Sequence, residues 1–204
     1  MKSSPRKFIE ITISDAGKIV RYKIGALLKI HLLEKMTDAD SVAAMRILFV
    51  CLGNICRSPS AENVMRAVAE REGILDDLEL DSAGTIGIHG GNAPDARMTA
   101  AAKGRGITIR GASRQIRSAD FTEFDLIVPM DESNLRDLKA WPGAAEGTAK
   151  LKLFCEFCEK FTDTHEVPDP YYGGAEGFET VMDLLEDGCE VIARKFKDGT
   201  LLKD

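Results

Sequence analysis

The sequence predicts an α/β fold with a central four-stranded parallel sheet and helices on both faces. Three observations support this prediction: an apolar, β-prone run at residues 46–51, an alternation of strand-like and helix-like segments after it, and a long amphipathic segment at 176–197. Strands that alternate with helices pair in parallel, because each helix returns the chain to the start of the next strand. Such crossovers are right-handed, and a binding site is expected at the carboxyl ends of the strands.

The first strand and the helix after it carry the clearest signals. Residues 46–51 are continuously apolar, which is typical of a strand buried on both faces. Ser58-Pro59 follows and predicts a helix start with proline at the first helical position, so we expect a helix over 59–73. The alternation then continues: strand 78–83, helix 95–104, a loop with short helical turns to about 123, strand 125–130, helix 131–139, strand 150–154 and helix 176–197.

Residues 1–44 precede this pattern and are expected to form an N-terminal extension. Residues 7–24 read as two strands joined by a turn at 14–17, and residues 26–36 read as a helix. An isolated hairpin is only marginally stable in water. The extension therefore docks on the rest of the chain, binds a partner or is disordered, and a non-native start upstream of Met45 is a further alternative.

A short polar loop joins Cys51, at the end of the first strand, to the following helix. Its backbone N–H groups can turn inward and form an anion-binding nest at the helix N-terminus. A thiol held there should ionise more readily, and the Arg57 guanidinium can hold two phosphate oxygens in a fork. Cys51 is therefore a candidate nucleophile that attacks phosphorus. The loop residues expected to bind the substrate are Leu52, Gly53, Asn54, Ile55, Cys56 and Ser58.

Two of these loop residues have side chains suited to support the others. Ser58 can donate its hydroxyl to the Cys51 thiolate. Asn54 can lock the loop through side-chain hydrogen bonds while it tolerates a left-handed backbone. Each of them can equally be an ordinary helix or turn cap.

Cleavage of a phosphate ester also requires a proton for the leaving oxygen, and Asp169 is the candidate acid. Pro168 and Pro170 flank it and favour an extended loop over a helix. Tyr171 and Tyr172 follow, and can form an aromatic wall on which a phenyl phosphate stacks. The alternative for these residues is an aspartate in a turn with aromatic loop anchors.

The loop has the form Cys-x5-Arg-Ser, and with it the sequence resembles the low-molecular-weight protein tyrosine phosphatases over about residues 45–197. Further motifs occur in the order of that family: Asp81-Ser82-Ala83-Gly84, Pro94-Asp95-Ala96-Arg97, Phe124-Asp125-Leu126-Ile127, Met130-Asp131-Glu132-Ser133-Asn134-Leu135 and Asp169-Pro170-Tyr171-Tyr172-Gly173. The resemblance implies a phosphatase domain at 45–204 with a flavodoxin-like three-layer fold. It also implies hydrolysis of phosphotyrosine and aryl phosphate monoesters through a cysteinyl-phosphate intermediate, without a cofactor.

The resemblance implies roles for three further groups. Asp169 would act as general acid in the first step and as the general base that activates water in the second. Ser82 matches a serine that braces Asn54. Asp131 would orient the site from behind the residues that touch the substrate.

The remaining cysteines leave other questions open. The resemblance implies that Cys56 forms a reversible disulfide with Cys51 on oxidation, whereas its position near the start of a buried helix equally suits an inert core residue. The Cys155-x2-Cys158 pair with His165 has the spacing of half a zinc site, but a second cysteine pair is missing and no metal site is predicted. With five cysteines and a thiol needed for chemistry, a reducing, cytoplasmic compartment is expected.

Three alternative functions share parts of the pattern. Protein-arginine phosphatases of the wider family carry threonine where this chain has Ile55, so Ile55 favours tyrosine. Arsenate reductases on the same fold relay electrons through extra cysteines, and none occurs here between Cys56 and Cys155. A catalytically silent phosphate-binding module would need neither Cys51 nor Asp169.

The composition is that of a globular enzyme. The chain has 204 residues, 44% of them hydrophobic, and a net charge of -6, which offers nucleic acid no uniform attraction. No apolar run is long enough to span a bilayer. The expected partner is a phosphotyrosine protein or a small aryl phosphate, and the chain is expected to be a monomer or weak dimer. A local basic stretch is expected to be a solvated loop that steers anionic substrates: Arg105, Arg110, Arg114 and Arg117.

Overall fold

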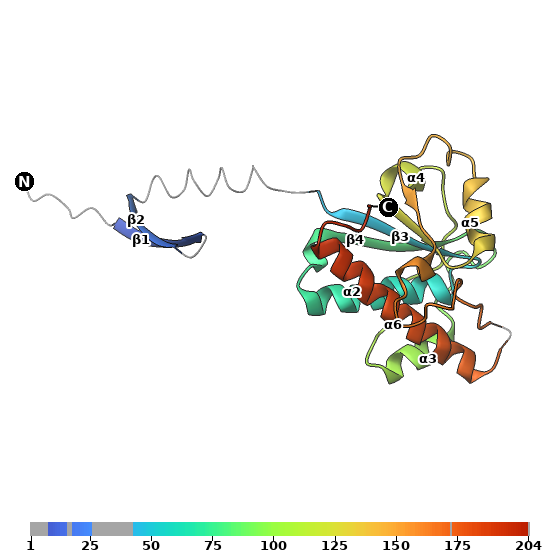
Figure 1. Ribbon diagram of the computed structural model, residues 1–204. Coiled ribbons are helices and arrows are strands. Elements are labelled where there is room, and N and C mark those ends of the chain that lie inside the picture. The colour runs from blue at the N-terminus through green and yellow to red at the C-terminus, as the bar shows by residue number, and fades with distance from the viewer. Residues whose placement is uncertain (1–7, 16–17, 26–42, 172, 204) are drawn as a thin grey trace, which may run out of the picture. The chain divides into compact units, whose positions relative to one another are not determined.

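The computed structural model describes residues 8–15, 18–25, 43–171 and 173–203. The chain divides into two compact units, Met1–Ala43 and Ala44–Asp204 (Figure 1). The expected helix at 26–36 lies outside the described residues.

The first unit contains one antiparallel pair of strands. Strand β1 (Phe8–Asp15) pairs with β2 (Lys18–Gly25), so that Phe8 lies opposite Gly25 and Asp15 opposite Lys18. These are the two strands that the alternation of residues 7–24 predicted.

The second unit is built on a parallel sheet of four strands in the order β4-β3-β5-β6. The central strand β3 (Met45–Cys51) pairs on one side with β4 (Leu78–Gly84) and on the other with β5 (Leu126–Pro129), and β6 (Lys150–Leu151) forms the far edge. The chain thus runs from β3 to one neighbour and later returns on the opposite side. Strand order reverses at the carboxyl end of β3, which is where open α/β sheets bind ligands.

Alternate residues of β3 face two different hydrophobic cores. Ile47 and Phe49 contribute to the core beneath α2 (Arg57–Glu72) and α6 (Ala175–Lys197), whereas Leu48 and Val50 contribute to the core on the opposite face. This division follows from the two-residue period of a strand. The predicted three-layer α/β fold, with helices on both faces of a four-stranded parallel sheet, is confirmed.

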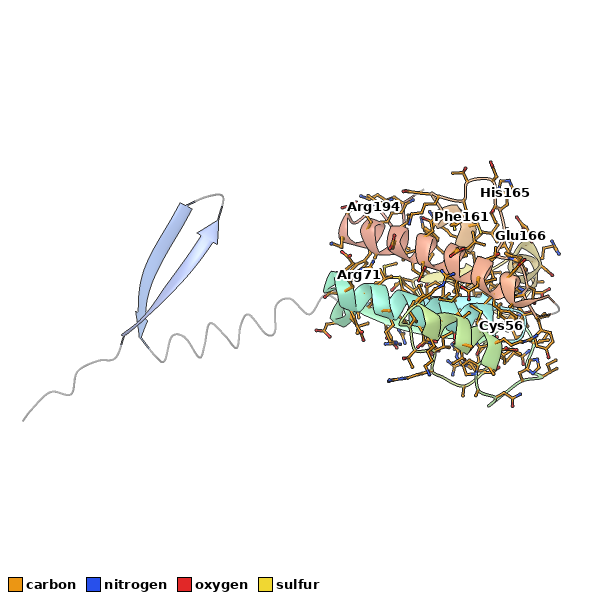
Figure 2. All side chains as sticks on the ribbon, turned by 90° about the horizontal axis from the view of Figure 1, so that it is seen from below. Cys56, Arg71, Phe161, His165, Glu166 and Arg194 are labelled. Carbon is orange, nitrogen blue, oxygen red and sulfur yellow. The ribbon has the colours of Figure 1, made fainter. Side chains whose placement is uncertain are left out.

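The helices divide between the two faces. On one face α2, α3 and α6 pack side by side (Figure 1 and Figure 2), and α4 and α5 cover the other. Neither face includes a helix that is long and apolar enough to cross a membrane, within the part of the chain that the structure describes. The remaining bounds are α3 (Ala96–Gly104), α4 (Asp120–Glu123), α5 (Glu132–Lys139) and the 3-10 helices η1 (Leu75–Asp77) and η2 (Phe154–Phe157).

The predicted start of α2 was wrong by two residues. The helix begins at Arg57 with Cys56 as its N-cap, so that Pro59 is the third helical residue and not the first. The missing N–H of Pro59 removes no helical hydrogen bond, because the first four N–H groups of a helix have no partner within it. The helix ends at Glu72, and its C-cap Gly73, with a φ of 70°, terminates the last turn.

The predicted strand 150–154 was too long. Strand β6 ends at Leu151, and the chain then turns into η2, where Phe154 and Phe157 are buried. The ring of Phe154 lies 6.3 Å from that of Phe49 in β3. Burial of both rings favours the tight turn over an extended edge strand.

The contact between η2 and α6 predicts an unusual response at Gly188. A Cβ atom at this position would lie 2.4 Å from Cε1 of Phe154, whose side chain is fully buried. Alanine in a helix normally stabilises by about 1 kcal/mol relative to glycine, but overpacking a core costs about 1 to 3 kcal/mol. We expect Gly188→Ala to lower the free energy of unfolding by about 1 kcal/mol in urea titrations. Gly104→Ala is the control, because its added Cβ would point into open space. Equal free energies of unfolding for the two variants would contradict the packing argument.

Candidate functional site

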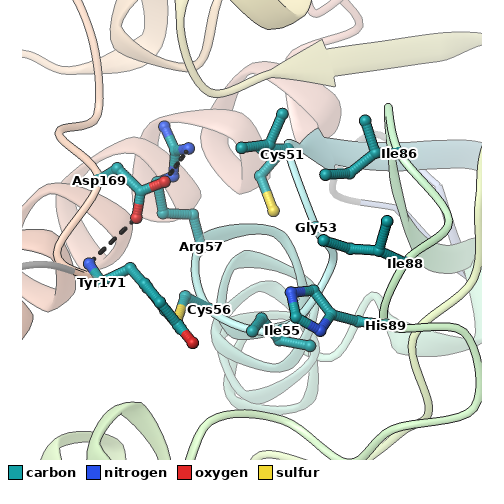
Figure 3. Close-up of a pocket in the computed structure, with 11 residues that line it drawn as sticks. Cys51, Gly53, Ile55, Cys56, Arg57, Ile86, Ile88, His89, Asp169 and Tyr171 are labelled. Atoms are coloured by element: carbon teal, nitrogen blue, oxygen red, sulfur yellow. Dashed lines mark hydrogen bonds and ion pairs between the residues drawn. The ribbon is translucent and has the colours of Figure 1, made fainter.

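An open pocket of about 200 Å³ lies at the carboxyl end of β3 (Figure 3). Asp169 and Tyr171 stand on one side of it and Ile88 and His89 on the other, with the Cys51 side chain between them. The lining residues are Cys51, Leu52, Gly53, Ile55, Cys56, Arg57, Ile86, Ile88, His89, Asp169 and Tyr171. The structure therefore brings most of the predicted site residues to one cavity.

The loop from Cys51 to Arg57 is held by hydrogen bonds to its carbonyl groups from outside the pocket. The Cys51 and Leu52 carbonyls accept from the N–H groups of Thr85 and Ile86, each at 2.9 Å. Three more carbonyls are held in the same way: Gly53 by Ser113 Oγ at 3.0 Å, Ile55 by the Asp95 N–H at 2.7 Å, and Cys56 by Ser60 Oγ at 2.7 Å.

These contacts direct the N–H groups of the loop. In a planar trans peptide the N–H points opposite to the preceding C=O, so each carbonyl held outward turns the following N–H inward. The five N–H groups that follow the five held carbonyls belong to Leu52, Gly53, Asn54, Cys56 and Arg57. Together with the N-terminus of α2 they form a concave set of donors suited to an anion.

Cys51 is buried at the base of this loop, with 3% of its surface exposed. Its Sγ accepts from the N–H of Asn54 at 3.3 Å and lies 3.0 Å from Ser58 Oγ. The Ser58 hydroxyl also lies 3.1 Å from the Ala83 carbonyl, so its single proton can be donated to either acceptor. The Cys51 sulfur therefore lies within hydrogen-bond reach of two donors, the Asn54 N–H and the Ser58 hydroxyl.

Asn54 holds the loop in a conformation that few residues adopt. Its φ is 53°, in the left-handed region, and its side chain is buried. Its Nδ2 donates to Ser58 Oγ and to Ser82 Oγ, both at 3.0 Å, and its Oδ1 accepts from the N–H of Arg114 at 2.8 Å. Three partners from three segments thus hold one strained residue. The contact between Ser82 and Asn54 is the one that the family resemblance implied.

Arg57 connects the loop to the opposite wall of the pocket. Its Nη1 donates to Asp131 Oδ2 at 2.6 Å and to the Val167 carbonyl at 3.1 Å, and its Nη2 donates to Asp169 Oδ2 at 2.8 Å. Burial opposes the charge of this guanidinium, but Cys51 and the two carboxylates outweigh it and raise the pKa of Arg57. The guanidinium is therefore a fixed positive charge beside the Cys51 sulfur.

Asp169 reaches the pocket from an extended segment. Its Oδ1 accepts from the N–H of Tyr171 at 3.1 Å, and 37% of its side chain is exposed. The Tyr171 ring stands at the mouth of the pocket, beside Asp169 (Figure 3). Tyr172, which was also predicted to bind substrate, lies outside the described residues.

The other loop residues occupy different depths. Leu52 is at the rim with 42% of its surface exposed, and Ile55 is half-buried. A Cβ at Gly53 would lie 2.8 Å from Cδ2 of His89, so glycine allows the imidazole to lie over the loop. Cys56 is buried, and burial together with the charge of Asp95 raises the pKa of its thiol to about 12.

Sequence reasoning missed His89, Ile86 and the contacts of Arg97. His89 and Ile86 come from the loop after β4, where the sequence has no local pattern that predicts a pocket. Arg97 was noted only as part of a family motif. The sequence does offer one signal nearby, because aspartate is a preferred N-cap residue. The Asp95 side chain caps α3 by accepting from the Arg97 N–H at 2.8 Å.

The expected solvated basic stretch was wrong for Arg105 and Arg114, whose side chains are largely covered, whereas Arg110 and Arg117 are exposed. Arg105 pairs with the α6 carboxylates of Glu179, Asp183 and Glu186. Arg114 and Arg117 share the fully buried Asp120. Each of these three guanidiniums therefore has a carboxylate partner, which for Arg105 lies up to 81 residues away in the chain.

The half-zinc pattern lies apart from this pocket. Cys158 Sγ is 3.7 Å from the Leu184 carbonyl of α6, and His165 is exposed (Figure 2). Within the described ranges, no group of three or more His, Cys, Asp or Glu side chains is arranged to hold a metal ion.

A cysteine at the centre of an anion-binding loop, with an arginine and a carboxylate beside it on a doubly wound sheet, defines a class of phosphate-binding α/β proteins. The sequence model of the low molecular weight phosphotyrosine protein phosphatases matches residues 46–200. The chain belongs to this family of phosphoric monoester hydrolases, and the predicted family is confirmed.

Individual relatives agree with that assignment. A putative low molecular weight protein-tyrosine-phosphatase of Synechocystis is 52% identical over 145 residues, which is 71% of this chain and 92% of that protein. The human low molecular weight phosphotyrosine protein phosphatase is 41% identical over 75% of this chain and 96% of that protein.

Solved structures give the same fold. A protein tyrosine phosphatase from Entamoeba histolytica superimposes with a TM-score of 0.73 at 43% identity and covers 78% of this chain and all of that one (100%). A Drosophila arginine phosphatase gives a TM-score of 0.70 at 32% identity over 75% of this chain and 98% of that one.

The three hydrogen bonds of Asn54 lead to a stability prediction with a matched pair of variants. Asn54→Ala removes these bonds and keeps the cost of a left-handed backbone, so we expect the free energy of unfolding to fall by about 3 kcal/mol. Asn54→Gly removes the same bonds, but glycine adopts positive φ freely, and we expect a loss about 1 kcal/mol smaller. Urea unfolding measures both. Equal losses would show that the backbone conformation at Asn54 carries no strain.

Proposed function

We propose that this protein is a tyrosine phosphatase that hydrolyses phosphotyrosine and aryl phosphate monoesters through a phosphocysteine at Cys51. The observation that carries the proposal is the meeting of Cys51, Arg57 and Asp169 at one pocket, around a loop whose N–H groups face inward. The catalytic domain of this proposal is residues 45–204, and residues 1–44 take no part in the chemistry. The family match over residues 46–200 and the compact unit Ala44–Asp204 support that division.

In the first proposed step the Cys51 thiolate attacks the phosphorus of the bound ester. A bond forms between sulfur and phosphorus, and the bond between phosphorus and the phenolic oxygen breaks. The electron pair of that bond goes to the leaving oxygen, which takes a proton from Asp169. The loop N–H groups and Arg57 hold the equatorial oxygens as the phosphoryl group moves to sulfur.

In the second proposed step water replaces the cysteine. Asp169, now a carboxylate, accepts a proton from the attacking water, and the oxygen of that water bonds to phosphorus. The sulfur–phosphorus bond breaks, which releases inorganic phosphate and restores the thiolate. Ser58 supports this step because its hydroxyl lies 3.0 Å from Sγ and can stabilise the departing sulfur anion.

The rim of the pocket supports an aryl substrate. Within residues 43–171 and 173–203, the exposed large hydrophobic side chains are Leu52, Ile88 and Tyr171, and all three line this pocket. A phenyl ring that enters between them buries apolar surface on both faces, while its phosphate reaches the loop. Alkyl phosphates would bury less apolar surface against the same rim and would therefore bind more weakly.

Phosphoarginine is the second candidate substrate, because the chain also resembles an enzyme that is named an arginine phosphatase. Ile55 supports tyrosine over arginine, since its aliphatic side chain lines the pocket and offers a guanidinium no hydrogen-bond acceptor. Parallel assays with phosphotyrosyl and phosphoarginyl peptides of the same sequence separate the two, and a thioredoxin-coupled assay separates arsenate reduction.

We further propose that Cys56 protects Cys51 during oxidation in a reducing, cytoplasmic compartment. Peroxide converts the Cys51 thiolate to a sulfenic acid, which condenses with the Cys56 thiol to a disulfide and releases water. Because the pKa of Cys56 is raised to about 12, its reactive thiolate becomes about tenfold more abundant with each pH unit up to that value. Protection should therefore improve as pH rises.

Rapid-quench trapping tests the proposed function. With an aryl phosphate we expect the parent protein to yield a phosphorylated cysteine and Cys51→Ser to yield none. Asp169→Asn should slow ester cleavage by about a hundredfold with a phosphotyrosyl peptide, and by less with an activated phenol that leaves without a proton. A parent protein that binds phosphate but forms no covalent intermediate would identify a silent binding module instead.

Peroxide followed by a thiol reductant tests the role of Cys56. We expect activity to return in the parent and to be lost permanently in Cys56→Ser, because an unprotected sulfenic acid proceeds to irreversible sulfinic acid. Cys158→Ser is the matched control and should recover like the parent. Equal recovery in Cys56→Ser would overturn the protective role.

A further inference from the structure

Arg97 holds a position between the two sides of the pocket. Its Nη2 donates to Asp95 Oδ2 at 2.8 Å and its Nε to Asp95 Oδ1 at 3.1 Å, which is a two-point, fork-like ion pair. Asp95 is itself attached to the phosphate-binding loop, because its N–H donates to the Ile55 carbonyl at 2.7 Å. One side of Arg97 is therefore fixed to the loop that surrounds Cys51.

The other side of Arg97 contacts the segment that carries the acid. Its guanidinium carbon lies 5.2 Å from the ring centroid of Tyr171 and 4.8 Å from that of Phe178, so the cation is in contact with two aromatic rings. Its Nη1 also donates to the Tyr171 carbonyl at 3.1 Å. Both the ring and the backbone of Tyr171 are thereby positioned by one side chain.

These contacts form a closed circuit along one side of the pocket. From the Ile55 carbonyl it passes through Asp95, Arg97 and Tyr171 to Asp169, whose Oδ1 accepts from the Tyr171 N–H. It then returns through Asp169 Oδ2 to Arg57, two residues after Ile55 in the loop. Arg97 is the only member of the circuit that contacts both the loop side and the acid side without lining the pocket itself.

We propose that Arg97 is a positioning residue that sets the orientation of the Asp169 carboxyl and of the Tyr171 ring relative to the phosphate-binding loop. The proposal rests on the proposed function, in which Asp169 protonates the leaving oxygen. A proton donor must lie within hydrogen-bond reach of the atom it protonates, so a small rotation of the Tyr171 backbone would impair the transfer. The defect would be greatest for leaving groups that depend most on that proton.

If the role of Arg97 were purely structural, its loss would lower the thermal stability of the protein and would lower kcat equally for both kinds of substrate. The Arg97 side chain is 48% exposed, and ion pairs of exposed side chains contribute little to stability. Its loss should therefore leave thermal unfolding nearly unchanged. A positioning role predicts instead that the loss of kcat depends on the leaving group and that it becomes smaller when Asp169 is also replaced.

The experiment compares Arg97→Met, Arg97→Lys and the control Arg110→Met with two substrates. Arg110 is an exposed arginine, and its methionine variant makes the same change in net charge outside the circuit. We expect Arg97→Met to lower kcat by about tenfold with a phosphotyrosyl peptide and by at most about threefold with p-nitrophenyl phosphate. Arg97→Lys keeps the charge but loses the two-point pair, so its kcat on the peptide should lie between those of the parent and Arg97→Met. Arg110→Met should match the parent.

A double-mutant cycle with Asp169→Asn completes the test. If Arg97 acts through Asp169, then Arg97→Met in the Asp169→Asn background should lower kcat on the peptide by less than about twofold. The proposal is overturned by equal losses on both substrates, by the same tenfold loss in the Asp169→Asn background, or by an Arg97→Met protein that matches the parent. A parent protein that hydrolyses neither substrate would instead refute the proposed function.

Discussion

The site depends on the outward direction of the carbonyl groups in the loop from Cys51 to Arg57. Two of them accept from the backbone that continues β4, at Thr85 and Ile86, and a third accepts from Asp95 at the start of α3. This arrangement requires close approach of the two strand ends: a Cβ at Gly84 would lie 2.7 Å from the Leu52 carbonyl oxygen. The glycine thus allows the sheet to hold the loop in the form that presents N–H groups to an anion.

The last residue of that loop, Arg57, brings a positive charge to the pocket. Arg57 is almost fully buried, and its guanidinium is shared by Asp131 and Asp169. A buried cation is stable only when it is paired, and here the pairing also fixes its direction toward the loop. Asp131 accepts from Nη1 and Asp169 from Nη2, so the two carboxylates hold different nitrogens of the guanidinium.

Prediction from sequence succeeded where the signal was local. The apolar run of β3, the polar loop after it and the proline-flanked Asp169 are patterns of a few residues, and each lies in the structure where its pattern placed it. The end of β6 was misjudged because a tertiary contact overrides the local signal: Phe154 is buried against Phe49. The start of α2 was misjudged for a local reason, because proline is tolerated throughout the first turn of a helix and Pro59 therefore does not mark the first position. The pairing of Arg105 with α6 and the contacts of Arg97 join segments more than 70 residues apart, and no window of sequence contains them.

The proposed acid illustrates how a distant residue reaches the loop. Asp169 is 112 residues from Arg57 in the chain, yet the Val167 N–H donates to the Met130 carbonyl at 2.8 Å, directly after β5. The segment therefore continues the carboxyl edge of the sheet beside β3. Because the Val167 carbonyl also accepts from Arg57, the same residue that carries the positive charge holds the backbone two positions before the acid. Sheet edge, guanidinium and acid are thus positioned together by the same few contacts.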